Sequence, residues 1–221
     1  EKGQGEFDAS FYEVAKKLSY PEELKTVSLA FASSMNVGTV ADLEAGKAFL
    51  GSMSEDKQYV DSLSQKLVAS YVSGLSQLPP EKAAASIREL PGNYQVSATE
   101  ATARKLADPA NASGFFQFAS TLGGTPGLAD LAYRNAFERF GYQSPSSSSS
   151  LINQVPEQYQ SEAIHGYVSG WVRQDPIAAS EWARSQSAKR MEPAAKAIVS
   201  YFRNKKADPS EIEAWEKMVG P

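Results

Sequence analysis

Apolar residues recur every three or four positions along most of the chain, which is the spacing of one face of an α-helix. Such stripes predict helices over residues 8–19, from Pro21 to about Asn36, over 39–53 and over 156–174. The most regular stripe comprises Tyr59, Val60, Leu63, Leu67, Val68, Tyr71, Val72 and Leu75. No stretch alternates between apolar and polar residues over five positions with β-branched enrichment, so strands are not expected. The pattern predicts an all-α protein.

Polar residues at the start of several stripes predict where helices begin. Asp8 precedes the first stripe and suits its N-cap. Ser97 and Glu100 have the spacing of a capping box, which predicts a helix that starts there and ends near Ala107.

An Asp-Pro pair followed by an aromatic residue seven positions after the Asp occurs in two close copies. An N-cap Asp accepts hydrogen bonds from the free amides of the first turn, and Pro suits the first helical position because no amide hydrogen is needed there. The aromatic residue then lies about two turns into the helix, so both Trp are expected to pack in the core between neighbouring helices. The two copies are Asp175, Pro176 and Trp182, and Asp208, Pro209 and Trp215.

Two weaker copies extend the motif toward the N-terminus. In the third copy the aromatic residue is Phe, and the positions are Asp108, Pro109 and Phe115. The segment after Ser144 has Pro145, five serines and then Leu151 at the same spacing. It is either a fourth, degenerate copy or a serine-rich linker; the agreement in spacing favours the copy.

The copies start at 108, 144, 175 and 208, so their spacings are 36, 31 and 33 residues. A period in the low thirties is typical of a two-helix repeat. The expected architecture is a single continuous domain over 1–221, built from antiparallel helical-hairpin repeats in an α-solenoid-like array, either right- or left-handed. A soft boundary at the serine-rich stretch 144–150 is the alternative.

The repeat resembles a known class of helical proteins. In period and helix pairing the chain is similar to tetratricopeptide-like helical-hairpin repeat proteins. The segment from Trp171 to Ala183 looks more like the degenerate Trp…Asp-Pro-x-Ala-Ala-x-x-Trp-Ala repeats of uncharacterised exported bacterial proteins. This resemblance is specific only over about 160–221. The Trp-x-x-Leu-Gly-x-x-Tyr signature of tetratricopeptide repeats is absent, so no binding residue is carried over. The resemblance implies protein–protein interaction.

Composition narrows the function classes. The net charge of −4 and the pI near 5.2 argue against general nucleic-acid binding. Without cysteine there is neither a disulfide nor a thiolate metal site, and a single His makes a zinc site unexpected. No apolar run approaches the length of a membrane span. The chain begins at Glu1 and not at Met, as the mature part of an exported protein or a trimmed chain would, and an exported location is favoured over the cytoplasm.

The one candidate for catalysis is a pair on a predicted helix. His165 follows Glu162 by three residues, so the two side chains share a face and could act as a general base with an orienting carboxylate. A lone His on an amphipathic helix is more often an ordinary boundary residue, so the chain is expected not to be an enzyme. Neither a cofactor nor a metal is expected.

Charge is uneven along the chain, and this asymmetry suggests a binding surface. Residues 173–206 contain eight basic and three acidic residues, a net charge of +5 in an otherwise acidic chain. The basic residues predicted to contact a protein or peptide partner are Arg173, Arg184, Lys189, Arg190, Lys205 and Lys206. The alternative is a solvated helix face with no partner. The predicted function is a non-enzymatic scaffold that binds a protein or peptide in a helical groove, and the alternative is an enzyme that uses Glu162 and His165.

Overall fold

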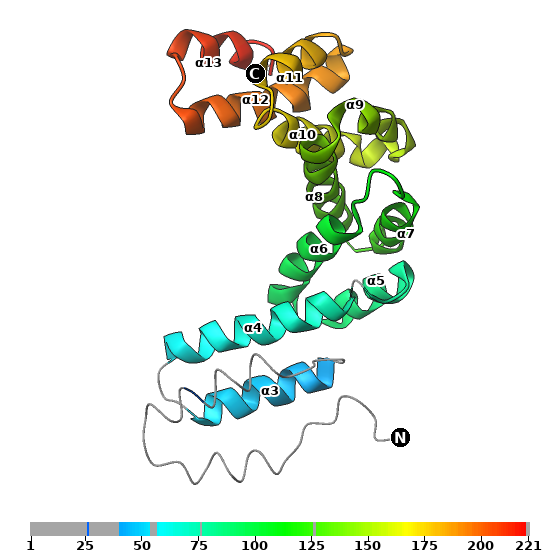
Figure 1. Ribbon diagram of the computed structural model, residues 1–221, viewed down its shortest axis with the longest axis vertical. Helices are drawn as coiled ribbons and strands as arrows, with labels where there is room; N and C mark the ends of the chain where they lie inside the picture. The colour runs from blue at the N-terminus through cyan, green and yellow to red at the C-terminus, as the bar shows by residue number, and fades with distance from the viewer. Residues whose placement is uncertain (1–25, 27–39, 54–56, 76, 126, 220–221) are drawn as a thin grey trace. The chain divides into compact units, whose positions relative to one another are not determined.

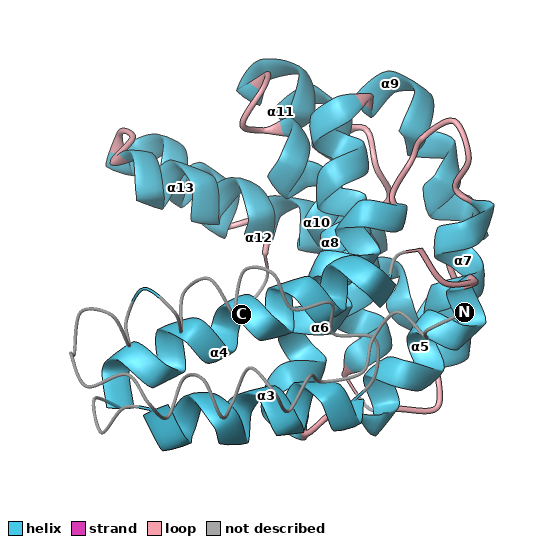
Figure 2. Cartoon of the chain, turned by 60° about the horizontal axis from the view of Figure 1, so that its bottom comes forward, coloured by secondary structure: helices cyan, strands magenta, loops and turns pink. Residues whose placement is uncertain are grey.

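The computed structural model describes residue 26 and residues 40–53, 57–75, 77–125 and 127–219. Every regular element in these ranges is a helix (Figure 2), so the all-α prediction is confirmed. The helix expected over 8–19 and its cap Asp8 lie outside the described residues, as does all but Thr26 of the next expected helix. The helices are α3 (Val40–Met53), α4 (Lys57–Leu75), α5 (Pro80–Glu89), α6 (Gly92–Leu106), α7 (Ser113–Leu122), α8 (Leu128–Gln143), α9 (Pro145–Ser148), the 3₁₀ helices η1 (Ser149–Gln154) and η2 (Glu157–Tyr159), α10 (Gln160–Trp171), α11 (Pro176–Arg184), α12 (Ala188–Lys205) and α13 (Pro209–Glu216).

The chain divides into two compact units, Glu1–Ala98 and Thr99–Pro221. In the first unit α4 packs against α3 and α5. The stripe that predicted α4 faces inward, since Leu63, Leu67 and Leu75 are almost fully buried. Helical periodicity therefore identified the core of this unit from the sequence.

In the second unit, alternate helices pack on one another. α8 packs against α10, and α10 packs against α12. In addition, α7 packs against α8, and both α11 and α13 pack against α12 (Figure 1). This arrangement places the Asp-Pro helices α11 and α13 on the same neighbour, α12.

The contact between α8 and α10 depends on glycine. A Cβ atom on Gly166 would overlap the backbone carbonyl of Arg134, and one on Gly170 would overlap that of Glu138. In the opposite direction, a Cβ on Gly141 of α8 would overlap the carbonyl of α10 residue Tyr167. The two backbones therefore touch directly, which only a residue without a side chain allows.

An aromatic cluster forms the core beside this contact. Phe115 is fully buried, and its ring meets those of Tyr133 and Phe140 edge-on, with centroids 5.5 and 6.0 Å apart. Tyr133 stacks on Tyr159 at 5.1 Å. Burial raises the pKa of Tyr133 to about 12, so its hydroxyl is neutral at physiological pH. The aromatic position of the third motif copy is thus a core residue.

The start of that third copy differs from the expectation. Asp108 Oδ1 accepts a hydrogen bond from the Ala110 amide at 2.9 Å, which stabilises a turn, and α7 begins only at Ser113. Asp108 and Pro109 therefore do not cap and open a helix as the corresponding residues of the later copies do. The same residue types support either structure, because an Asp side chain bonds equally well to the amides of a turn.

The serine-rich stretch is helical. Pro145 opens the short helix α9, as expected of the favoured motif copy, and Ser149–Gln154 is a 3₁₀ helix. Ser144 occupies the N-cap position without a capping hydrogen bond from its side chain. α6 begins at Gly92 and not at Ser97, since the amides of the residues after Gly92 already bond back to Pro91.

Candidate partner-binding site

The Asp-Pro motifs position the helices that surround the site. Asp175 Oδ1 accepts hydrogen bonds from the amides of Ile177 at 3.1 Å and Ala178 at 2.9 Å. Asp208 Oδ1 accepts from the Ser210 amide at 2.8 Å and from its hydroxyl at 2.6 Å. The prolines that follow stand at the first helical positions of α11 and α13. The predicted N-caps are confirmed for both close copies.

The two Trp residues of the motif have different surroundings. Trp215 is 3% exposed, as expected of a core residue. Trp182 is only half-buried, and it lies against the rings of Tyr167 and Trp171 at centroid distances of 5.1 and 6.1 Å. The expectation of a core position therefore holds for Trp215 and only in part for Trp182.

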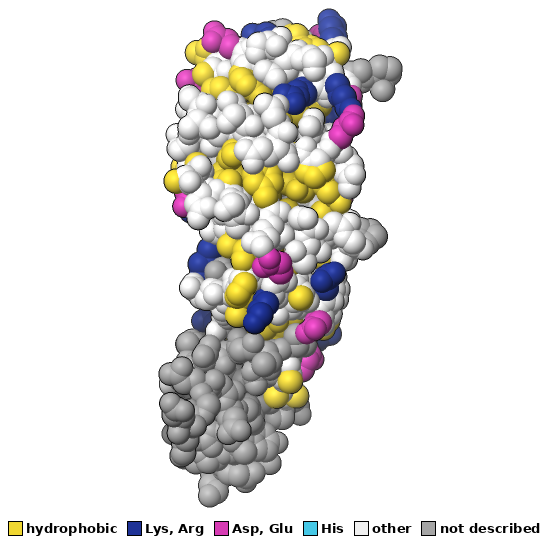
Figure 3. Space-filling model, turned by 90° about the vertical axis from the view of Figure 1, so that its right-hand side faces the viewer, with side chains coloured by type: hydrophobic (Ala, Val, Ile, Leu, Met, Phe, Trp, Pro, Cys, Tyr) yellow, Lys and Arg dark blue, Asp and Glu magenta, His cyan; other side chains and the backbone are white. Residues whose placement is uncertain are grey.

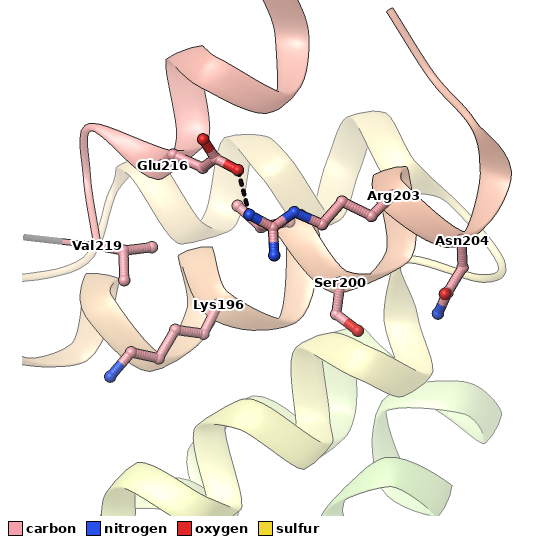
Figure 4. Close-up of a pocket in the computed structure, with 7 residues that line it drawn as sticks. Lys196, Ser200, Arg203, Asn204, Glu216 and Val219 are labelled. Atoms are coloured by element: carbon pink, nitrogen blue, oxygen red, sulfur yellow. Dashed lines mark hydrogen bonds and ion pairs between the residues drawn. The ribbon is translucent and has the colours of Figure 1, made fainter. Parts of the chain in front are cut away.

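A cavity of about 430 Å³ lies between α12 and α13 (Figure 4). Arg203 of α12 forms an ion pair with Glu216 of α13 at its edge. Val199 of α12 contributes apolar surface, and it is nearly buried. Besides Val199, four residues of α12 and two of α13 and the turn after it line the cavity: Lys196, Ser200, Arg203, Asn204, Glu216 and Val219.

A second cavity, of about 420 Å³, lies between α11 and α13. Trp215 and Phe202 contribute aromatic surface, and the guanidinium of Arg184 lies 4.8 Å from the centre of the Trp215 ring. Ile177, 71% exposed, lines the same cavity, and Glu211 adds a negative charge to it. This cavity is lined by one cation, Arg184, and two carboxylates, Glu181 and Glu211, whereas the cavity beside α12 is lined by two cations and one carboxylate.

The charges on α12 and α13 are opposite. Residues 188–206 contain six basic residues and one Glu, whereas residues 207–221 contain four acidic residues and one Lys. α13 packs on α12, so an acidic helix rests on a basic one. On the face shown in Figure 3, basic and acidic side chains of the described residues are interspersed and do not gather in one block.

The six basic residues predicted from the sequence lie in different surroundings. Arg184 alone among them lines one of the two cavities. Arg173 pairs with Glu138 at 2.6 Å, and Lys189 pairs with Glu157. The others are Arg190, whose guanidinium donates to Asn153 at 2.9 Å, Lys205, which lies 6.0 Å from the Tyr201 ring, and Lys206, which ends α12 with a φ of 53°.

The two basic residues of the cavity beside α12, Lys196 and Arg203, were not among the predicted partner-binding residues. A signal for them existed, because positions 196, 200 and 203 follow one face of a helix at i, i+4 and i+7. These three residues are polar, and the sequence alone does not show that a neighbouring helix forms a cavity with them.

Glu162 and His165, the catalytic alternative, do not form a pair that orients the imidazole. Glu162 instead binds Arg134 in an ion pair at 2.5 Å. His165 Nδ1 is buried and has no hydrogen-bond partner within the described ranges. Burial, and next the charge of Arg134, lower the pKa of His165. Neither Glu162 nor His165 lines either of the two cavities.

The described residues contain neither a membrane-spanning helix nor a cluster of metal ligands. No helix there has the length and apolar character needed to cross a membrane. Nor do three His, Asp or Glu side chains in those ranges come together as metal ligands.

No family model, curated protein or solved structure matches this chain. The resemblance to tetratricopeptide-like repeats therefore stays a prediction from the residues. The cavities and the helices around them are therefore the features that bear on function.

Proposed function

We propose that this chain is a non-enzymatic module that binds a protein or peptide segment in a groove between its helices. The observation that carries this proposal is the pair of cavities, about 430 and 420 Å³, on either side of α13. Cavities of this size can hold a few side chains of a bound segment. Each combines apolar surface with charged residues, so an apolar anchor can be buried while charges at the rim orient it.

The arrangement of helices supports the same reading. We propose that the second unit is built from helical-hairpin repeats of the tetratricopeptide-like kind. In support, Asp175 and Asp208 each cap their helix by accepting from the amide two residues further on, and α12 packs on α10 while α10 packs on α8. Stacked helix pairs form extended grooves, which is how such arrays bind segments of other proteins.

Selection from a library of short random peptides tests this function. Selected peptides should bind the whole chain in a fluorescence-anisotropy titration. Binding should weaken about tenfold or more when a cavity is filled by Ser200→Trp or Ala214→Trp, because these exposed positions line the two cavities.

Ala101→Trp is the matched control, since Ala101 is an exposed position of α6 outside both cavities. Circular dichroism melting should show that all three variants are folded. If no peptide is selected, or if selected peptides bind the two cavity-filled variants as well as the parent, the proposed function is wrong.

One observation favours the second candidate, an enzyme that uses His165. Its Nδ1 has no hydrogen-bond partner among the described residues, and the lowered pKa favours the neutral imidazole that a general base requires. Against this, Glu162 is occupied by Arg134, and neither residue lines a described cavity. A screen of hydrolase substrates with the parent and His165→Gln would detect such an activity as turnover that the variant loses.

A further inference from the structure

We propose that the cavity between α12 and α13 binds an acidic amphipathic helix of a partner protein. This inference rests on the proposed function and names the partner chemistry for one of its two cavities. Three observations carry it: the residues that line the cavity, the way α13 is already held, and the packing order of the helices.

The lining has the chemistry that an acidic helix needs. Lys196 and Arg203 place two cations at the cavity, and Ser200 lies between them on the same helix face. Seven residues separate the cations, which corresponds to about 10.5 Å along α12. Carboxylates seven residues apart on a helix lying along α12 have the same spacing, so two ion pairs can form together.

α13 shows how an acidic helix binds here. Its Glu216 pairs with Arg203, and its Trp215 is buried with the guanidinium of Arg184 against the ring. An apolar anchor and a carboxylate thus hold a helix of eight residues on the basic α12. A partner helix on the other side of the cavity would use the same combination, with Val199 and Val219 as the apolar contacts.

The packing order leaves a place for such a helix. The cavity-lining residues Lys196 and Ser200 are exposed, and by helical geometry they lie on the side of α12 opposite the buried Ala194 and Ile198. One side of α12 therefore faces the core, where α10 packs, and the other carries α13 and the cavity beside it. A partner helix at the exposed part of this cavity would lie on α12 next to α13.

The charges already present do not block this site. Lys196 pairs with Glu192, and Arg203 pairs with Glu216, but these lysine and arginine side chains are 52% and 63% exposed. Exposed ion pairs of this kind contribute little to stability, so the cations can add or exchange a carboxylate at low cost.

The test uses two synthetic amphipathic helical peptides and the full chain. Both peptides carry the same apolar residues, and one has Glu at positions i and i+7 where the other has Gln. The Glu peptide should bind about tenfold more tightly than the Gln peptide, as expected from two partly screened ion pairs. Lys196→Gln should remove most of this difference. Lys82→Gln, at an exposed position of α5 outside the cavity, should leave it unchanged.

Ser200→Trp separates the site from general charge attraction, because it fills the cavity without changing a charge. It should weaken binding of both peptides, while its melting temperature stays close to that of the parent. Equal binding of the Glu and Gln peptides, or unchanged binding to Ser200→Trp, would overturn the inference. If library-selected neutral or basic peptides still bind in that case, the proposed function survives without it; if no peptide of any charge binds, both are wrong.

Discussion

The guanidinium of Arg184 in α11 lies 4.8 Å from the ring centre of Trp215 in α13, so a cation–π contact joins the two Asp-Pro helices. Trp215 is nearly buried beneath it. The contact links the motif aromatic of one copy to the helix of the other, and it forms one wall of the cavity between them.

The difference in burial between Trp215 and Trp182 predicts that their replacement lowers stability by unequal amounts. Trp215→Ala should lower the free energy of unfolding by about 3–5 kcal/mol, because it removes a buried aromatic side chain. Trp182→Ala should cost less, since Trp182 is half-buried. Urea denaturation followed by circular dichroism measures both. Equal losses would mean that the exposed part of Trp182 contributes as much as the buried ring of Trp215.

The direct backbone contact between α8 and α10 gives a second prediction. Gly166→Ala should destabilise the second unit by roughly 3 kcal/mol or more, because the added methyl group overlaps a backbone carbonyl that cannot turn aside. Gly124→Ala is the control, since an added Cβ there meets nothing within 4 Å. A Gly166→Ala protein as stable as the control would show that α8 and α10 can separate without loss.

The N-cap of α11 gives a third prediction. Asp175→Ala should cost about 1 kcal/mol by removing the acceptor for two first-turn amides. Asp175→Asn should retain most of the stability, because its side-chain oxygen still accepts. Asp108→Ala should cost less than Asp175→Ala, since Asp108 closes a turn and not a helix. Chemical denaturation of the three variants decides this order.

The buried imidazole predicts how stability depends on pH. Burial and Arg134 lower the pKa of His165 in the folded protein, so below about pH 6.5 the unfolded chain binds a proton that the folded chain resists. Stability should fall as the pH drops through that value and level off below the lowered pKa. In thermal melts, the melting temperature of His165→Gln should fall less than that of the parent between about pH 7.5 and pH 5.5. An unchanged pH profile would mean that His165 titrates alike in both states.

Salt should separate the two cavities. Binding of an acidic helix beside α12 should weaken steeply as salt rises, because screening shortens the reach of charges to roughly 3 Å at 1 M. Binding in the cavity between α11 and α13 should not weaken in this way, because two carboxylates and one Arg line it, so an acidic helix gains no net charge attraction there. Anisotropy titrations at low and high salt, with Ser200→Trp and Ala214→Trp to assign each peptide to its cavity, provide the comparison.

Local sequence patterns were enough to predict the all-helical fold and the first residues of two helices. Helical periodicity identified the buried face of α4, and the caps at Asp175 and Asp208 were readable because an N-cap is closed by hydrogen bonds within one turn. Two other predicted helix starts were wrong. Asp108 closes a turn and does not cap a helix, and α6 starts at Gly92, five residues before the predicted start at Ser97. Residues next to one another in the chain decide these features only when no neighbouring helix changes the balance.

The tertiary structure alone decided which surfaces meet. Gly166 and Gly170 are visible in the sequence at a spacing of four, but nothing local shows that α8 approaches their backbone. The sequence does not show that Lys196 and Arg203 line a cavity, because α13 forms its other wall. Nor does it show that Trp182 and Trp215, which have the same place in the motif, differ in burial. The reason is physical: a side chain's burial and a cavity's charge depend on groups from distant parts of the chain, and only packing brings these together.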